Sequence, residues 1–125
     1  MASLVPKPST LILYVADIAA SCVFYTGLLG RVPMEQSPNF GMFALEGGIL
    51  LGLWASHDVD PEPKGAGGGA ELAFTLPDNP ALDALHEVWS GRGYAIAQAP
   101  IEKDFGYTFT ALDPDGHRLR VMVTP

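Results

Sequence analysis

Hydrophobic and polar positions follow the same order twice along this chain. In the first half, the apolar, β-branched run at 10–15 predicts a buried strand. Apolar residues then recur at helical spacing, which predicts a helix over 18–29 that begins after Asp17 as N-cap and ends at Gly30. Short strands are expected at 31–34, 41–45 and 49–54, and the residues 46–48 predict a hairpin between the last two.

The second half repeats this order. A strand is expected at 71–76, followed by a helix with Asn79 as N-cap and Pro80 in its first position. The helix runs to about residue 90, and its predicted inner face consists of Leu82, Leu85, Val88 and Trp89. Strands follow at 95–99, 107–112 and 119–123, and a tight turn at 113–116 joins the last two.

This repetition predicts an α+β fold made of tandem βαβββ modules. The segments 15–17 and 76–78 hold equivalent places, with Asp17 and Asp78 61 residues apart. Module one spans about 9–57, a Gly-rich linker about 58–70, and module two about 71–125, within a single domain, 1–125. Each module is too small to bury both faces of its sheet. We therefore expect two curved mixed sheets with helices on the convex side, which enclose a cup within one chain or across a domain-swapped homodimer.

The composition of the chain limits the kinds of partner that it can bind. The chain of 125 residues is 48% hydrophobic, and its 7 Lys+Arg against 14 Asp+Glu give a net charge of −7. An acidic chain is a poor match for nucleic acid or for anionic membrane surfaces. The longest uncharged run, 18–30, is too short to span a membrane, and the N-terminus has no secretory signal pattern. The single cysteine, Cys22, forms no internal disulfide, so we expect a cytoplasmic protein.

Two segments carry a family resemblance. LYVADIAASCVFYTGLLG (13–30) and FTALDPDGHRLRVMV (109–123) resemble the opening and the end of the vicinal-oxygen-chelate superfamily, the glyoxalase/bleomycin-resistance/dioxygenase fold. The resemblance implies that the four metal-ligand positions of catalytic relatives fall here on Thr10, Gly52, Glu71 and Arg120. One carboxylate beside a guanidinium cannot hold a divalent ion, since a Lewis-acid site needs about three protein ligands. We therefore expect no metal and no cofactor.

A narrower resemblance concerns function. The segments 38–54 and 104–121 resemble small phenazine-antibiotic resistance proteins, which are metal-free dimers that bind a planar aromatic drug and sequester it. The resemblance implies a homodimeric drug-binding protein with no catalytic residue. The alternative is a metal-dependent or metal-free lyase, isomerase or dioxygenase of the same superfamily, in which Glu71 acts as a general base.

Strand alternation predicts which side chains line the cup. Leu11, Leu13 and Val15 are expected to face the helix. Trp54 offers a stacking surface, and Gly52 leaves room beside it. Arg120 is a candidate to hold a ligand carboxylate or to stack on a ring, and Glu71 to accept a ligand hydrogen bond or to pair with Arg120. Aromatic residues are expected at the mouth, although Phe43 also fits a core position and Phe105 a loop. The candidate ligand-binding residues are Thr10, Tyr14, Phe40, Phe43, Gly52, Trp54, Glu71, Phe105 and Arg120.

Overall fold

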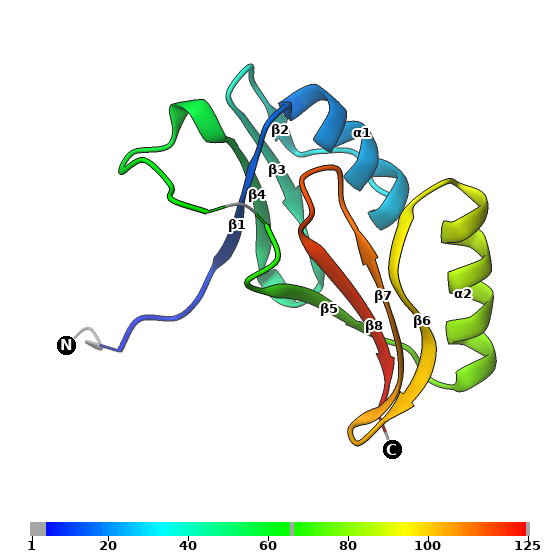
Figure 1. Cartoon of the computed structure of the whole chain (residues 1–125). Coiled ribbons are helices and arrows are strands. Elements are labelled where there is room, and N and C mark those ends of the chain that lie inside the picture. Colours follow the sequence, from blue (N-terminus) through cyan, green and yellow to red (C-terminus); the bar gives the residue numbers. More distant parts are fainter. Residues whose placement is uncertain (1–4, 66, 125) are drawn as a thin grey trace. The chain divides into compact units, whose positions relative to one another are not determined.

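The computed structural model describes residues 5–65 and 67–124, which form two compact units (Figure 1). Unit 1 comprises residues 1–64 and unit 2 residues 65–125. The boundary between the units lies within the segment 58–70. Each unit is a four-stranded mixed sheet with one α-helix, so the repeated order of elements and the α+β class are confirmed.

Unit 1 contains β1 (Thr10–Val15), α1 (Ile18–Leu29), β2 (Glu35–Gln36), β3 (Phe40–Ala44) and β4 (Leu50–Ala55), with short 3₁₀ turns at Glu46–Gly48 and Ser56–Asp58. The strand order is β1-β4-β3-β2, with β1 parallel to β4 and the other neighbours antiparallel. Helix α1 has the predicted bounds: the Asp17 carboxylate accepts the N–H of Ala20 at 3.1 Å, and Gly30 ends the helix at φ 68°.

The core of unit 1 lies between α1 and one face of its sheet. Ile18, Cys22 and Tyr25 of the helix are buried. Leu51 and Leu53 of β4 are fully buried, as strand alternation predicts for the face that meets the helix. Gly41 permits this packing, because a Cβ at that position would stand 2.7 Å from the Cys22 Sγ.

Unit 2 contains β5 (Glu71–Thr75), α2 (Asn79–Gly91), β6 (Ala95–Lys103), β7 (Gly106–Leu112) and β8 (Arg118–Val123). The strand order β5-β8-β7-β6, with β5 parallel to β8, repeats that of unit 1. Trp89 of α2 is buried and meets Phe74 and Phe109 edge-on, with ring centroids 6.2 and 5.5 Å apart. The turn between β7 and β8 is built on Asp113, whose Oδ1 accepts the N–H groups of Asp115 and His117.

The start of α2 differs from its prediction. The N-cap is Asp78 rather than Asn79, and Pro80 therefore lies one position further into the helix. The reason is geometric, because the Asp78 carboxylate reaches the N–H of Ala81 at 2.8 Å. Val88 was wrongly placed on the inner face: it is 46% exposed, and Leu82 and Trp89 are the buried residues of this helix.

Two strands also differ in extent. β2 was predicted at 31–34 but consists of Glu35–Gln36, because the hydrogen bonds to β3 form further along the chain. β6 was predicted to end at Ala99 but continues to Lys103. Its last residues are mostly exposed on an edge strand with register shifts, so their hydrophobic pattern does not resemble that of a buried strand.

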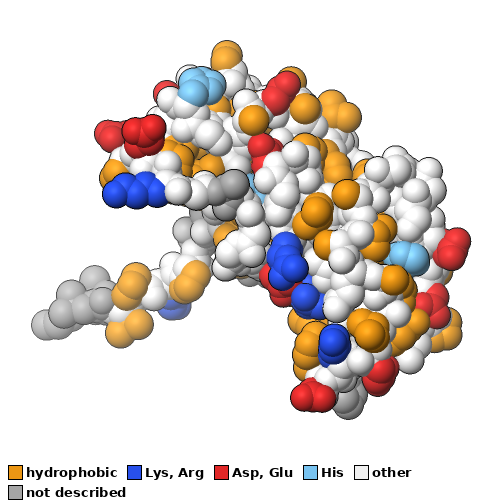
Figure 2. Space-filling model, in the orientation of Figure 1, with side chains coloured by type: hydrophobic (Ala, Val, Ile, Leu, Met, Phe, Trp, Pro, Cys, Tyr) orange, Lys and Arg blue, Asp and Glu red, His pale blue; other side chains and the backbone are white. Residues whose placement is uncertain are grey.

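The chain carries a net charge of −7. The face drawn in Figure 2 shows acidic, basic and apolar side chains interspersed. In the part of the chain that the structure describes, neither helix has the length and apolar character needed to cross a membrane.

Candidate functional site

The sheet of unit 1 has an aromatic face on the side opposite α1. We define this aromatic face by three rows of residues paired across β1, β4 and β3: Thr10–Leu50–Ala44, Ile12–Gly52–Met42 and Tyr14–Trp54–Phe40. None of these nine residues carries a formal charge. Ile12 and Tyr14 are 44% and 40% exposed, so this face presents large apolar side chains that a ligand can reach. The structure thus places five of the predicted site residues together: Thr10, Tyr14, Phe40, Gly52 and Trp54.

Trp54 is held in a defined orientation on this face. Its Nε1–H donates to the Oδ2 of Asp58 at 2.9 Å, and Asp58 lies in the 3₁₀ turn that follows β4. The ring of Tyr14 stands edge-on to the indole, with centroids 6.3 Å apart and planes at 79°. The polar edge of the indole is therefore satisfied within the chain, and the indole itself is half-buried. Such an arrangement reserves the ring faces for apolar or stacking contacts.

The space beside Gly52 is filled by the chain itself, which corrects the expectation that this glycine leaves room for a ligand. A Cβ built at Gly52 would stand 3.0 Å from the Cζ of Phe40 and 3.4 Å from the Cγ1 of Ile12. Gly52 thus allows the Phe40 ring to lie close to the sheet. Its contribution to the aromatic face is the placement of Phe40, next to Trp54 in the pairing of β3 with β4.

Phe43 does not belong to this face. It is fully buried on the α1 side of the sheet, and its ring lies 6.4 Å from that of Tyr25. Alternation along β3 puts Phe40 and Met42 on one face and Gly41 and Phe43 on the other. The prediction of Phe43 at the mouth of the cup is therefore wrong, and its alternative interpretation as a core residue holds.

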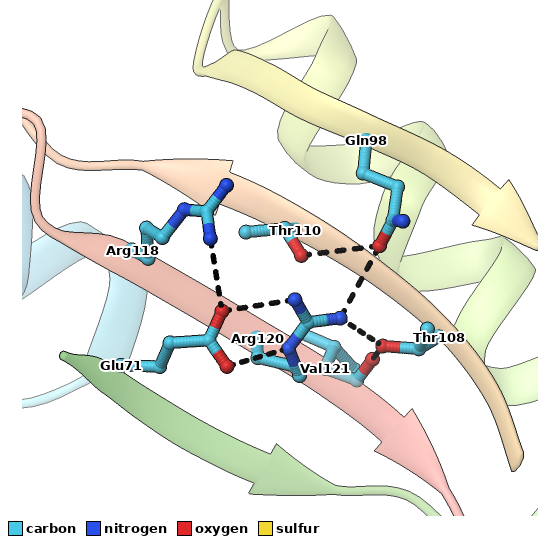
Figure 3. A network of polar contacts seen from close by, with 7 residues as sticks. All are labelled: Glu71, Gln98, Thr108, Thr110, Arg118, Arg120 and Val121. Carbon is cyan, nitrogen blue, oxygen red and sulfur yellow. Dashed lines mark hydrogen bonds and ion pairs between the residues drawn. The ribbon is translucent and has the colours of Figure 1, made fainter. Parts of the chain in front are cut away.

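Unit 2 has a polar cluster on the side of its sheet opposite α2 (Figure 3). At its centre, Arg120 donates from Nε to Oε1 of Glu71 at 2.7 Å and from Nη2 to Oε2 at 2.9 Å. Arg118 approaches the same carboxylate at 3.7 Å. Nη1 of Arg120 donates to Gln98 and Thr108, at 3.2 and 3.1 Å. We define the polar cluster by its side chains: Glu71, Gln98, Thr108, Thr110, Arg118 and Arg120.

The cluster is internally satisfied. Thr108 is fully buried and donates its hydroxyl to the backbone carbonyl of Val121 at 2.7 Å, and Thr110 lies 3.4 Å from Oε1 of Gln98. The side chain of Arg120 is 17% exposed and that of Glu71 31%. Because the Glu71 carboxylate fills the bidentate fork of Arg120, the guanidinium cannot hold a ligand carboxylate in the same way unless this pair separates.

The contact between Glu71 and Arg120 also shifts the pKa values of both residues. The hydrogen bond from Arg120 lowers the pKa of Glu71, against a smaller opposing effect of burial, and the charges of Arg120 and Arg118 lower it further. The pKa of Arg120 is raised, chiefly by its hydrogen bond to Glu71. A carboxylate with a lowered pKa is a weak proton acceptor, so the cluster does not favour Glu71 as a general base.

Phe105 lies with the polar cluster of unit 2. It occupies the turn between β6 and β7, is 44% exposed, and its ring centroid lies 5.8 Å from the guanidinium carbon of Arg120. This distance permits a cation–π contact. Phe105 is therefore both a turn residue and a neighbour of Arg120, which are the two roles expected for it.

The four positions implied by catalytic relatives do not fit a divalent metal. Thr10 and Gly52 offer at most one hydroxyl between them, and both oxygens of Glu71 accept hydrogen bonds from Arg120. Among residues 5–65 and 67–124, His, Cys, Asp and Glu side chains form no group of three that could hold a metal ion. This set has one carboxylate, and a guanidinium stands where a metal ligand would be needed. It therefore cannot bind a divalent metal ion for catalysis.

A separate surface groove of about 590 Å³ lies in unit 1 between the start of α1 and the β2–β3 turn. Asp17, Gln36, Ser37 and His57 are among its lining residues. None of the predicted site residues lines it, and the Asp17 carboxylate is engaged as the cap of α1. We therefore assign the candidate site to the aromatic face and the polar cluster rather than to this groove.

Several participants were absent from the sequence prediction. Asp58 was missed because nothing in the local pattern connects it with Trp54, four residues earlier. Gln98 was missed because a shift of register in β6 places it beside Thr110. Thr108 and Thr110 carried a usable signal, since two threonines alternate in a strand whose other positions are apolar.

This pair of βαβββ units, with Glu71 and Arg120 in its second sheet, has a clear family. The chain belongs to the glyoxalase/bleomycin resistance protein/dioxygenase superfamily, whose model matches residues 7–121. Among curated proteins it is 27% identical, over 91% of this chain and 89% of the relative, to the phenazine antibiotic resistance protein EhpR of Enterobacter agglomerans.

Solved structures agree with this assignment. Protein ATC0852 from Agrobacterium tumefaciens, determined by solution NMR, is 45% identical, with 97% of this chain and 99% of that chain covered and a TM-score of 0.90. A glyoxalase/bleomycin resistance protein/dioxygenase from Nocardioides is 22% identical, with coverages of 98% and 86% and a TM-score of 0.82, which shows the shared fold alone.

Proposed function

We propose that this protein binds and sequesters a planar aromatic antibiotic or metabolite, of the phenazine type, and so confers resistance to it. The observation that carries the proposal is Trp54: an indole fixed by Asp58 and Tyr14 on the sheet face opposite α1. The relation to a phenazine antibiotic resistance protein supports the same ligand class.

The chemistry of the aromatic face suits a flat, conjugated ligand. An offset-stacked or edge-to-face aromatic pair contributes roughly 0.5–1.5 kcal/mol beyond the burial of its area. Phe40 and Tyr14 are paired with Trp54 in one row, and Ile12 and Met42 lie in the next. A face of this kind holds a ligand by shape and apolar contact and requires no reacting group.

The proposal includes the setting of the protein. It acts as a homodimer in the cytoplasm, with a small planar aromatic ligand as its partner and without a cofactor, nucleic acid or membrane. The net charge of −7 supports the absence of a polyanionic partner.

A binding experiment with phenazine tests the proposal. Trp89 is replaced by Phe to remove its emission, since this indole of α2 is buried against Phe109 and reports no ligand directly. In this background, phenazine should quench Trp54. Trp54→Ala, measured by equilibrium dialysis, should weaken binding by about tenfold or more, because aromatic anchors dominate such sites. Trp54→Phe should retain most of the affinity.

The same experiment distinguishes binding from catalysis. Phenazine recovered unchanged after prolonged incubation supports sequestration. Conversion of the ligand by the wild type, lost in Glu71→Gln, would instead support the metal-free enzyme of this superfamily. A tightly held divalent metal, present at one equivalent per chain and required for conversion, would support the metal-dependent enzyme. Equal affinity in Trp54→Ala and the wild type would contradict the stacking site.

A further inference from the structure

The aromatic face has an acidic border at one end, and this border bears on the charge of its ligand. β1 and β4 are parallel, so their carboxyl ends lie at the same edge of the sheet, where Tyr14 pairs with Trp54. Acidic residues follow both strands: Asp17, whose carboxylate caps α1, is two residues beyond β1, and Asp58 is three residues beyond β4, with Asp60 and Glu62 further along. The aromatic row thus lies at the acidic edge.

Asp58 contributes more than general charge. Its carboxylate accepts the Nε1–H of Trp54 at 2.9 Å, so a negative charge is fixed at the rim of the stacking ring. A hydrogen bond to an anion pushes electron density toward the indole, whose face already attracts cations. A ring stacked on Trp54 would lie close to this carboxylate and be subject to its field.

The basic groups of unit 1 do not offset this field. Arg31 donates to the carbonyl of Ala44 at 2.6 Å and pairs with Glu46 at 2.9 Å, at the opposite end of β3 from Phe40. Lys7 precedes β1 and so lies before the strand end that is remote from Tyr14. The remaining basic residue of this unit, Lys64, follows Asp58, Asp60 and Glu62 and is outnumbered by them.

We infer that the aromatic face selects planar heteroaromatic cations over neutral rings of the same shape and discriminates against anions, with Asp58 as the residue that sets this preference. The inference rests on the proposed function, since it concerns the same ligand site. Asp58 acts here in two ways, by orienting the Trp54 indole and by supplying the charge next to it.

Three probes of matched shape test the inference: 10-methylacridinium as the cation, acridine as the neutral ring and acridine-9-carboxylate as the anion, all at pH 8 and low salt. Equilibrium dialysis gives their affinities in the Trp89→Phe background. The cation should bind about three- to fivefold more tightly than the neutral ring, as expected for an exposed cation–π and carboxylate site, and the anion should bind most weakly. Raising the ionic strength should reduce these differences.

Asp58→Asn separates the charge from the hydrogen bond, because the amide oxygen still accepts the indole N–H. In this variant the preference for 10-methylacridinium over acridine should disappear. Glu87→Gln is the matched control: it removes one exposed acidic charge from α2, outside the aromatic face, and should preserve the preference.

The outcomes distinguish the inference from the proposed function. Binding of acridine with no preference between the three charges, or tightest binding of acridine-9-carboxylate, would overturn the inference and leave sequestration of planar rings intact. A preference that persists in Asp58→Asn would overturn the role of Asp58. Absence of binding by all three probes and by phenazine would overturn the proposed function, and the inference with it.

Discussion

The two units share one backbone pattern but use the helix-free face of the sheet differently. The strand pairings allow the two sheets to be aligned. The pair Ile12–Gly52 of β1 and β4 corresponds to the pair Ala73–Arg120 of β5 and β8. In the neighbouring strands, Phe40 of β3 corresponds to Thr108 of β7. In this alignment Thr10 corresponds to Glu71. Unit 1 therefore has a glycine under an aromatic ring where unit 2 has a guanidinium that binds a carboxylate.

This comparison separates ligand binding from internal stabilisation. The aromatic face of unit 1 keeps large apolar side chains exposed, which costs solvation free energy and suits a surface that binds something. The polar cluster of unit 2 directs its hydrogen bonds inward, to Glu71, Gln98 and Thr108. The same fold thus supports an apolar binding surface in one unit and a polar network in the other.

The largest expected effect concerns the polar cluster. Arg120→Ala removes the partner of a partly buried carboxylate and should lower the free energy of unfolding by about 2 kcal/mol, below the full cost of a buried pair because Glu71 is partly exposed. Urea denaturation measures this. If the units differ as proposed, the affinity for phenazine should change much less than in Trp54→Ala. A ten-fold loss of phenazine affinity with unchanged stability would reverse the assignment of roles.

The helix caps test whether the two units respond alike. Asp17→Ala and Asp78→Ala each remove a carboxylate that accepts an amide N–H in the first turn of a helix. Each should lower the free energy of unfolding by about 1 kcal/mol. Asp17→Asn and Asp78→Asn, which retain an acceptor, should recover most of the loss. A substantial loss of stability in only one of the two alanine variants would show that the caps share their geometry but not their contribution to stability.

Acidification should act on unit 2 through Glu71. The pKa of Glu71 is lowered in the folded protein by Arg120, so its contribution to stability is present above its ordinary pKa, near 4.5, and is lost as the pH falls through the folded value. The loss should be under about 1 kcal/mol because Glu71 is solvent-accessible. Glu71→Gln should abolish this part of the pH dependence in urea titrations between pH 3 and 7, and Glu87→Gln should retain it.

The smallest effect concerns Gly52. Gly52→Ala places a methyl group 3.0 Å from the Phe40 ring, which must shift by a few tenths of an ångström. Because a flexible ring can move, stability should hardly change, and phenazine binding should weaken by about two- to threefold. Gly47→Ala in the β3–β4 connection, where φ is 79°, is the contrasting variant: it should cost stability and leave binding unchanged.

Local signals were sufficient for much of the fold. The bounds of α1 were predicted because an acidic cap, an apolar stripe and a terminal glycine coincide at 17–30. The sides of β1 were also predicted, as the exposed Tyr14 and the buried Val15 show. Where two capping residues compete, as at Asp78 and Asn79, or where an edge strand is solvated, as in β6, local pattern does not determine the result.

The sequence by itself determined the duplicated order of elements, the family, and the alternation that puts Trp54 and Arg120 on the helix-free faces. The order of elements and the alternation depend on period and spacing, and the family on the resemblance of the segments 13–30 and 109–123, all of which are local properties of the chain. Only the tertiary structure decided that Arg120 is held by Glu71, that Phe43 is buried, that Phe40 covers Gly52 and that Asp58 fixes the indole of Trp54. Each of these depends on strand register and side-chain reach, which bring together residues whose separation along the chain carries no local signal.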